Sequence, residues 1–173
     1  SDTLFLFSLK KTKIDFNIKK NFTILNNGLF AVMKDLALKV VKDGEGISKL
    51  LIVNVNKSRS QKQAKKIAFS IINSPLVKTA ISGEDANWGR VIAAIGKSQE
   101  KINQNKIELY FGKNLICKNG MVYNRLNLSK VNNYMKSKII EISVRLNIGR
   151  EKFTAYGNDL THEYIRINAE YRS

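Results

Sequence analysis

The sequence predicts a mixed α+β fold, and three observations support this prediction. Apolar residues at helical spacing alternate along the chain with short runs rich in β-branched residues. The dipeptide Asn119-Gly120 lies between two such runs and is a strong signal for a hairpin, which joins antiparallel rather than parallel strands. The 173 residues, of which 43% are apolar, suffice for one core of ordinary size or for two small lobes.

The first 50 residues predict a strand, a helix and a tight turn. Residues 2–7 are expected to form a buried strand that begins abruptly, as part of a larger fold. Residues 26–28, Asn-Asn-Gly, are expected to form a turn that caps the helix, and the stretch Asp43-Gly44-Glu45-Gly46 is expected to end it, because glycines favour tight turns. The helix itself is predicted from apolar residues three or four positions apart: Leu29, Met33, Leu36, Ala37, Val40 and Val41.

The middle of the chain predicts one strand followed by three helices. Residues 50–55 form a β-rich run, and Ser58 is expected to cap the helix that follows. Ser74-Pro75 is expected to stop that helix and to begin a shorter one, because proline suits the first helical position. Residues 83–90 are polar and are expected to be irregular, and an apolar helix is expected at 91–95.

The last third of the chain predicts mostly strands. The expected elements are a strand at 107–111, a hairpin of 115–117 with 121–123, a short helix at 129–137, a strand at 138–146 and a last strand at 164–167.

Composition narrows the classes of function. The net charge of +16 would suit a nucleic-acid-binding module, but the lysines are scattered and do not alternate with aromatic residues, so a lysine-rich surface is the favoured interpretation and no nucleic-acid partner is expected. No apolar run approaches the roughly 20 residues of a membrane-spanning helix, so no membrane partner is expected. The lone Cys117 allows neither an internal disulfide nor a cysteine cluster for a metal. These features together indicate a cytoplasmic protein without a metal site.

Two of the polar stretches contain side chains that could bind or catalyse. Glu45 lies between two glycines, so it could grip an ammonium group or act as a base, although a solvated turn carboxylate is the simpler interpretation. Residues 78–90 either bind a ligand or lock two parts of the fold together. We favour the structural role and predict that Trp88 is mostly buried and that Arg90 is paired with a carboxylate.

Two further stretches lie near the end of the chain. His162 has acidic neighbours, as in a catalytic triad, but no serine or cysteine elbow accompanies it, so a catalytic role is not expected. In the tail, Asn168 can both donate and accept hydrogen bonds, and Ser173 brings a hydroxyl.

These stretches together resemble the ornithine acetyltransferase (ArgJ) family. The likeness extends over essentially the whole chain, with Ala86 where the family usually has proline and His162 where an aromatic or other residue is common. The motifs occur in the family's order: Asp43-Gly44-Glu45-Gly46 with Ser48-Lys49, then 74–80, 83–90, 159–161 and 167–173.

The resemblance implies the β-chain portion of an enzyme that transfers acetyl from N2-acetyl-L-ornithine to L-glutamate in arginine biosynthesis. Such enzymes cut themselves before a threonine, which becomes the acetyl-carrying nucleophile, and they assemble as α2β2 heterotetramers. The start, Ser1-Asp2-Thr3, resembles a stretch shortly after that threonine, so the nucleophile is expected to precede Ser1 and no catalytic residue is expected in this chain. Thr3 is therefore not the nucleophile.

The resemblance also implies the site and the domains. Glu45, Asn168 and Ser173 match substrate-contacting positions of the family. Residues 1–48 are expected to be part of a layered α/β/β/α sandwich (DmpA/ArgJ-like) completed by the missing N-terminal part and the α chain. A smaller α+β lobe is expected at 49–158, and a strand and tail at 159–173 are expected to return to the active site. No cofactor is expected, and acetyl-CoA as a second acetyl donor is left open.

Two other functions remain as alternatives. A hydrolase or aminopeptidase of the related self-cleaving fold would use the same kind of nucleophile with water as acceptor, but it would not need the Asn168 and Ser173 tail to place an amino acid. A basic nucleic-acid-binding module is the third interpretation, and the order of the motifs argues against it.

Overall fold

The computed structural model describes residues 14–15 and 17–171. The chain divides into two compact units, Ser1–Ala37 and Leu38–Ser173, and each is described by itself. The strand expected at 2–7 lies outside the described residues. The expected domain divisions at 1–48, 49–158 and 159–173 stay predictions.

Helix α1 spans Lys19–Lys42 and none of its side chains is buried. The predicted cap at 26–28 is wrong, because these residues lie inside the helix. The helical spacing of apolar residues extends upstream through Phe22 and Leu25, so the helix starts earlier than the set from Leu29 onward suggested. Its end was predicted correctly, since the helix stops at Lys42, directly before the glycine turn.

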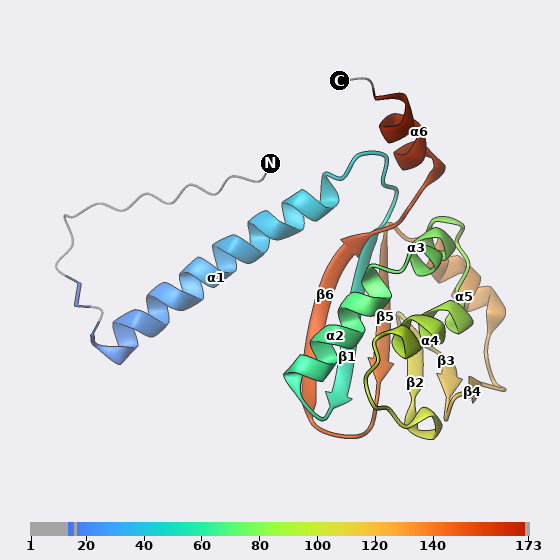
Figure 1. Cartoon of the computed structure of the whole chain (residues 1–173), viewed down its shortest axis with the longest axis horizontal. Coiled ribbons are helices and arrows are strands. Elements are labelled where there is room, and N and C mark those ends of the chain that lie inside the picture. The colour runs from blue at the N-terminus through green and yellow to red at the C-terminus, as the bar shows by residue number, and fades with distance from the viewer. Residues whose placement is uncertain (1–13, 16, 172–173) are drawn as a thin grey trace. The chain divides into compact units, whose positions relative to one another are not determined.

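The body of the second unit is a six-stranded mixed sheet with the order β4-β3-β2-β5-β1-β6 (Figure 1). The central strands β1 and β5 are parallel, and every other neighbouring pair is antiparallel. This arrangement confirms the predicted α+β class. The strands are β1 Leu50–Ser58, β2 Glu108–Phe111, β3 Asn114–Lys118, β4 Met121–Val122, β5 Ile139–Arg145 and β6 Glu151–Asn158.

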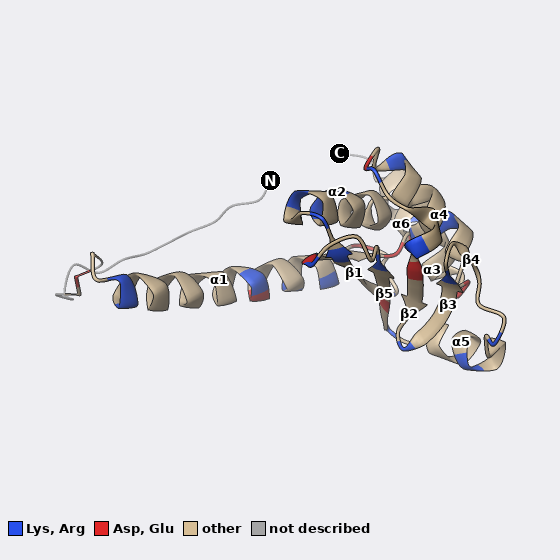
Figure 2. Cartoon of the chain, turned by 90° about the horizontal axis from the view of Figure 1, so that it is seen from below, with Lys and Arg blue, Asp and Glu red and all other residues tan. Residues whose placement is uncertain are grey.

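Helices cover the sheet on both sides. Helices α2 and α4 lie on one side and α5 on the other (Figure 2). Val53 of β1 is paired with Ile142 of β5 and Ala155 of β6, and all three are buried, so one line of the core crosses three strands. The helices of this unit are α2 Gln61–Ile72, α3 Pro75–Ser82, α4 Trp88–Lys97, α5 Leu128–Met135 and α6 His162–Glu170, with a short 3-10 helix at Gln104–Lys106.

Side-chain caps define where the middle helices begin. The Ser60 hydroxyl accepts a hydrogen bond from the amide of Gln63, so Ser60 caps α2 and the prediction of Ser58 is wrong. Ser58 instead ends β1, where its buried hydroxyl donates to Gln63 Oε1 over 2.8 Å. The cap at Ser74, followed by Pro75 in the first turn of α3, is confirmed.

The predicted hairpin is confirmed. Strands β3 and β4 are antiparallel neighbours, and Cys117 is paired with Val122. The loop residues Asn119 and Gly120 have φ of 55° and 75°, the left-handed region that a two-residue hairpin turn of this type requires at both positions. This is the reason that an Asn-Gly dipeptide is favoured there.

The end of the chain departs most from the sequence prediction. Strand β6, Glu151–Asn158, was not predicted, because its first two residues are charged and its alternation is short. The last strand predicted at 164–167 is wrong, since this stretch lies in helix α6. Its β-rich residues are overridden by a Thr161 cap and by Arg166, which pairs with Glu163 and Glu170 at helical spacing.

Candidate functional site

The glycine turn after α1 is held against the start of α6. Gly46 has φ of +64°, and a Cβ at this position would lie 2.5 Å from the amide nitrogen of Tyr164, so only glycine fits. The hydroxyl of Thr161 donates a hydrogen bond to the carbonyl oxygen of Gly46. Two predicted site segments far apart in the sequence, 43–46 and 159–173, therefore meet in the fold.

Glu45 projects from this turn into solvent. Its side chain is exposed, and its carboxylate has no hydrogen bond or ion pair with residues 14–15 or 17–171. An exposed carboxylate on a backbone that is fixed by its neighbours can bind a cation at little cost in ordering. The predicted role of Glu45 stays a prediction, and the turn supplies the geometry that it needs.

The other two predicted site residues lie at the end of the chain. Asn168 belongs to the last turns of α6, where its side-chain nitrogen donates to the carbonyl oxygen of Tyr164 over 2.8 Å. Its side-chain oxygen is the group that remains for a ligand. Ser173 lies outside the described residues. His162 is the first residue of α6 and is exposed.

Asp159 joins the start of β1 to the segment that follows β6. The residue is 2% exposed, and its carboxylate accepts hydrogen bonds from the Ser48 amide (2.9 Å), the Ser48 hydroxyl and the Lys49 amide (3.1 Å). A buried carboxylate is tolerated only when it is bonded in this way. Because Asp159 and Thr161 are two residues apart, this anchor also fixes the entry to α6.

Lys49 links this anchor to the 83–90 loop. Its ammonium group donates to Glu84 Oε1 over 3.0 Å and to the Met135 carbonyl over 2.6 Å, while the lysine is 6% exposed. Trp88 is partly buried and packs against the core. These contacts join the loop to neighbouring elements, in agreement with the favoured structural role, but Trp88 is less buried than predicted.

The predicted partner of Arg90 is wrong. Its guanidinium donates to the Leu76 carbonyl over 2.9 Å and to the Thr79 hydroxyl over 3.2 Å, and among the described residues no carboxylate pairs with it. The nearby acids have other partners, since Glu84 pairs with Lys49 and Asp85 accepts from the Asn87 amide group. Asn87 caps α4, so Trp88–Arg90 are helical rather than irregular.

Lys78 makes a third polar link at this end of the sheet. Its ammonium donates to Asn158 Oδ1 over 3.1 Å, and its carbonyl accepts from the amide of Leu160 over 3.4 Å. Burial lowers the pKa of the Lys78 ammonium below its ordinary value, and the negative charge of Asp159 offsets part of that shift. The side chain is half-buried, so the contact with Asn158 is partly shielded from water.

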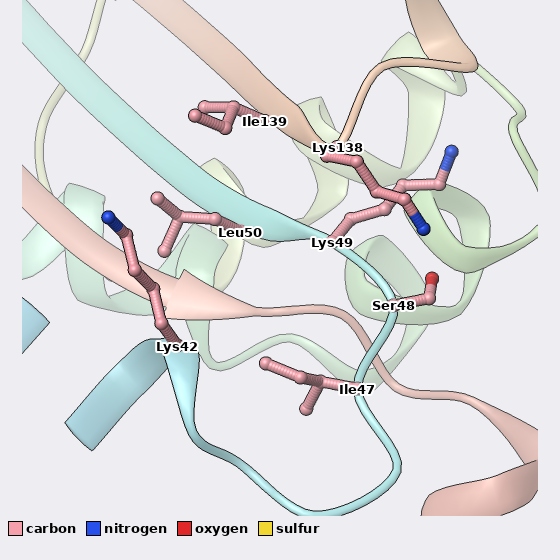
Figure 3. A pocket seen from close by; sticks show the side chains of 7 residues that line it. All are labelled: Lys42, Ile47, Ser48, Lys49, Leu50, Lys138 and Ile139. Carbon is pink, nitrogen blue, oxygen red and sulfur yellow. The ribbon is translucent and has the colours of Figure 1, made fainter. Parts of the chain in front are cut away.

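A hollow of about 280 Å³ lies beside the turn (Figure 3). The ammonium groups of Lys49 and Lys138 lie at one end of the view, and Lys42 projects at the other end. No acidic side chain is among the described residues that line it, but Lys49 is already paired with Glu84, so any preference for an anion would come from Lys42 and Lys138. Its walls are formed by Lys42, Ile47, Ser48, Lys49, Leu50, Lys138 and Ile139.

Neither a metal centre nor a membrane span is found in the part of the chain that the structure describes. No group of three or more His, Cys, Asp or Glu side chains is placed to hold a metal ion there. None of the described helices is both long and apolar enough to cross a bilayer. Cys117 is buried, and burial raises the pKa of its thiol, which keeps it protonated and unreactive.

The sequence did not reveal how the anchors pair. Ser48-Lys49 and Asp159 were visible as parts of separate motifs, but 111 positions separate Ser48 from Asp159. Lys78 was visible in the 74–80 motif and at the start of the 78–90 stretch, but neither pattern indicated that it would bond to Asn158. Only the sheet, which places the start of β1 beside the end of β6, brings these groups together: Leu50 is paired with Asn158.

The mixed sheet makes this protein an α+β domain. The polar links described above and the glycine turn that carries Glu45 lie at one end of that sheet. A model of the ArgJ family matches residues 1–173, so the chain belongs to this family. The resemblance read from the motifs is thereby confirmed.

Named relatives agree with this assignment. The chain is 40% identical over 176 residues to the arginine biosynthesis bifunctional protein ArgJ of Caulobacter vibrioides, covering 100% of this chain and 44% of that protein. The corresponding protein of Brucella melitensis is 42% identical over 179 residues, with 100% and 43% covered. The chain thus spans less than half the length of these relatives.

A solved structure supports the fold. The crystal structure of the arginine biosynthesis bifunctional protein from Bacillus halodurans matches with a TM-score of 0.82 and 38% sequence identity. The match covers 87% of this chain and 71% of that one.

Proposed function

We propose that this chain is the β-chain portion of a glutamate N-acetyltransferase and ornithine acetyltransferase that acts in arginine biosynthesis. The observation that carries the proposal is the family match over residues 1–173, to which the fixed glycine turn adds an exposed carboxylate at a motif of that family. The relatives named above are bifunctional proteins of arginine biosynthesis. A cytoplasmic location goes with this proposal.

The proposed chemistry is a two-step acetyl transfer. In the first step a threonine hydroxyl, expected before Ser1, attacks the acetyl carbonyl of N2-acetylornithine, so that ornithine leaves with its amine protonated and the acetyl group becomes an ester of the threonine. In the second step the amine of glutamate attacks this ester, which forms N-acetylglutamate and restores the hydroxyl. Each step moves one acetyl group and one proton, so neither a metal nor a redox cofactor is needed. Acetyl-CoA remains a candidate second donor.

Glu45 is proposed to bind the side-chain ammonium of ornithine. Ornithine carries this cation and glutamate does not, so a carboxylate at this position would favour the first substrate. Asn168 and Ser173 are neutral hydrogen-bonding groups and are proposed to serve both substrates. The contact between the glycine turn and the start of α6 supports the idea that Glu45 and Asn168 belong to one site.

The proposal includes an α chain as partner, in an α2β2 assembly. Helix α1 supports it, because the helix has no buried side chain although it carries many apolar ones. The limited coverage of the relatives' length is consistent with a further part of the enzyme.

The test is an acetyl-exchange assay on the chain co-expressed with the remaining part of the enzyme. Acetylornithine and glutamate are supplied with and without acetyl-CoA, and N-acetylglutamate and free acetate are measured. Formation of N-acetylglutamate supports the proposal, and dependence on acetyl-CoA separates a bifunctional enzyme from a single-function one. Release of acetate without transfer would instead indicate a hydrolase.

Glu45→Gln tests the assigned role of the turn. Loss of one charge-assisted hydrogen bond should lower kcat/KM for acetylornithine about 10- to 150-fold and affect glutamate much less. Glu151→Gln, an exposed carboxylate at the start of β6, is the matched control and should change neither. Deletion of Arg172 and Ser173 should leave assembly intact and weaken the binding of both substrates. Equal losses for both substrates in Glu45→Gln would contradict the role given to Glu45.

A further inference from the structure

Two anchors hold the backbone on either side of Glu45. On the carboxyl side, Thr161 donates to the Gly46 carbonyl. On the amino side, Asn158 Nδ2 donates to the carbonyl oxygen of Val41 over 3.4 Å, at the end of α1. Carbonyls in the last turn of a helix have no partner within the helix, so a side-chain donor there fixes where the chain leaves it.

The second anchor depends on which way the Asn158 side chain faces. An ammonium group only donates hydrogen bonds, so the atom of Asn158 that faces Lys78 must be an acceptor. This atom is the carboxamide oxygen, which lies 3.1 Å from the Lys78 nitrogen. The carboxamide nitrogen must then face Val41. Without the ammonium, the carboxamide could reverse, and its oxygen would oppose the Val41 carbonyl.

The turn itself lies directly against this carboxamide. A Cβ on Gly44 would be 2.8 Å from Asn158 Nδ2 and 3.0 Å from the side chain of Ile47. Backbone and carboxamide are thus in contact next to Glu45, and reorientation of Asn158 would displace the turn.

We propose that Lys78 is a positioning residue, which orients Asn158 and through it the turn that carries Glu45. Lys78 lies on α3, Asn158 ends β6 and Glu45 follows α1, so the link joins three separate elements. The role is indirect, because Lys78 acts through Asn158. The inference rests on the proposed function, in which Glu45 binds the side-chain ammonium of ornithine.

The experiment compares substitutions of Lys78 in the complete enzyme. Lys78→Met removes the ammonium and keeps most of the side-chain length, Lys78→Arg keeps a cationic donor, and Lys62→Met removes one exposed lysine from α2 as the matched control. KM and kcat are measured separately for acetylornithine and for glutamate. The melting temperature and the yield of assembled enzyme are recorded for each variant.

Lys78→Met should raise KM for acetylornithine about 3- to 10-fold, the effect of one hydrogen bond of ordinary strength, and change KM for glutamate less than about 2-fold. Lys78→Arg should recover most of the loss, and Lys62→Met should show none. In a Glu45→Gln background, Lys78→Met should cause no further change, because the group that it positions no longer carries its charge. A residue needed only for stability would not produce this pattern.

Three results would overturn the inference: unchanged kinetics in Lys78→Met, equal losses for both substrates, or a full additional loss in the Glu45→Gln background. If Lys78→Met does not assemble, Asn158→Ala replaces it and should give the same selective rise in KM for acetylornithine. Failure of both to assemble would make the link a folding element and also overturn the inference. Absence of acetyl transfer in the unsubstituted enzyme would refute the proposed function instead.

Discussion

Helices α1 and α2 differ in burial although both carry apolar residues at helical spacing. In α2 the apolar side is buried, and Ile67 and Ile71 are 0% exposed. In α1 no side chain is buried, and Leu29 and Met33 are 40% and 47% exposed. The spacing predicts an apolar face on both helices. Only the tertiary structure determines whether another element packs against that face and buries it.

The difference matters because packing stabilises most helices in proteins. Helix α2 contacts β1, β6 and α4, so its apolar side chains leave water when the unit folds. Helix α1 has no buried side chain although it carries many apolar ones, and contiguous exposed apolar surfaces mark sites of interaction. The two helices therefore predict different consequences for the same kind of substitution.

The largest effect is expected in the core. Ile71→Ala removes a fully buried side chain and should lower the free energy of unfolding by about 2–5 kcal/mol. Leu29→Ala in α1 should change it by less than about 0.5 kcal/mol, because the side chain is partly in water and alanine favours helix. Urea denaturation of this chain measures both. Similar decreases in the free energy of unfolding for the two variants would contradict the difference in burial between the two helices.

The next effect is expected in assembly. Leu29→Asp with Met33→Asp places two charges on the apolar face of α1, and binding to the proposed α chain should weaken by at least about 10-fold, since one buried apolar side chain contributes about 1.5–3 kcal/mol. Asn27→Asp with Ala31→Asp adds the same charge at the same spacing on the opposite side of the helix. Co-purification yield and titration of the partner measure the difference. Equal weakening by both pairs would show that the apolar face is not the contact.

A smaller effect is expected at the start of α2. Ser60→Ala removes the hydroxyl that caps the helix and should lower the free energy of unfolding by about 1 kcal/mol. Ser129→Ala on α5 serves as the control, because the cap of that helix is Asn127. The melting temperatures of both variants test this. A larger loss at Ser129 would disprove the assignment of the cap.

The smallest effect concerns pH and the half-buried Lys78. Burial lowers the pKa of its ammonium in the folded chain below 10.5, so between the lowered pKa and 10.5 the unfolded chain binds more protons than the folded one. The contribution of this group to stability therefore rises with pH across that window. The stability difference between the unsubstituted chain and Lys78→Met should shift in favour of the former from pH 8 to pH 10. Lys62→Met corrects for the loss of one charge, and an opposite slope would contradict the direction of the shift.

Local chemistry explains which elements could be predicted. The Asn-Gly hairpin, the Ser74-Pro75 start and the alternation at 107–111 depend on neighbouring residues only, and all three are confirmed. The errors at 58, at 26–28 and at 164–167 occurred where two local signals competed. At α6, β-rich residues competed with a cap and two ion pairs, and the helix formed.

The sequence by itself determined the α+β class, the glycine turn that carries Glu45 and the resemblance to the family, because these depend on spacing and on residue types along one stretch of chain. The tertiary structure alone decided that Asp159 anchors Ser48 and Lys49, that Lys78 holds Asn158, and that the turn meets the start of α6. These contacts join residues 80 to 115 positions apart. Sequence spacing carries no information about such pairs, since the order of strands in the sheet determines which chain segments become neighbours.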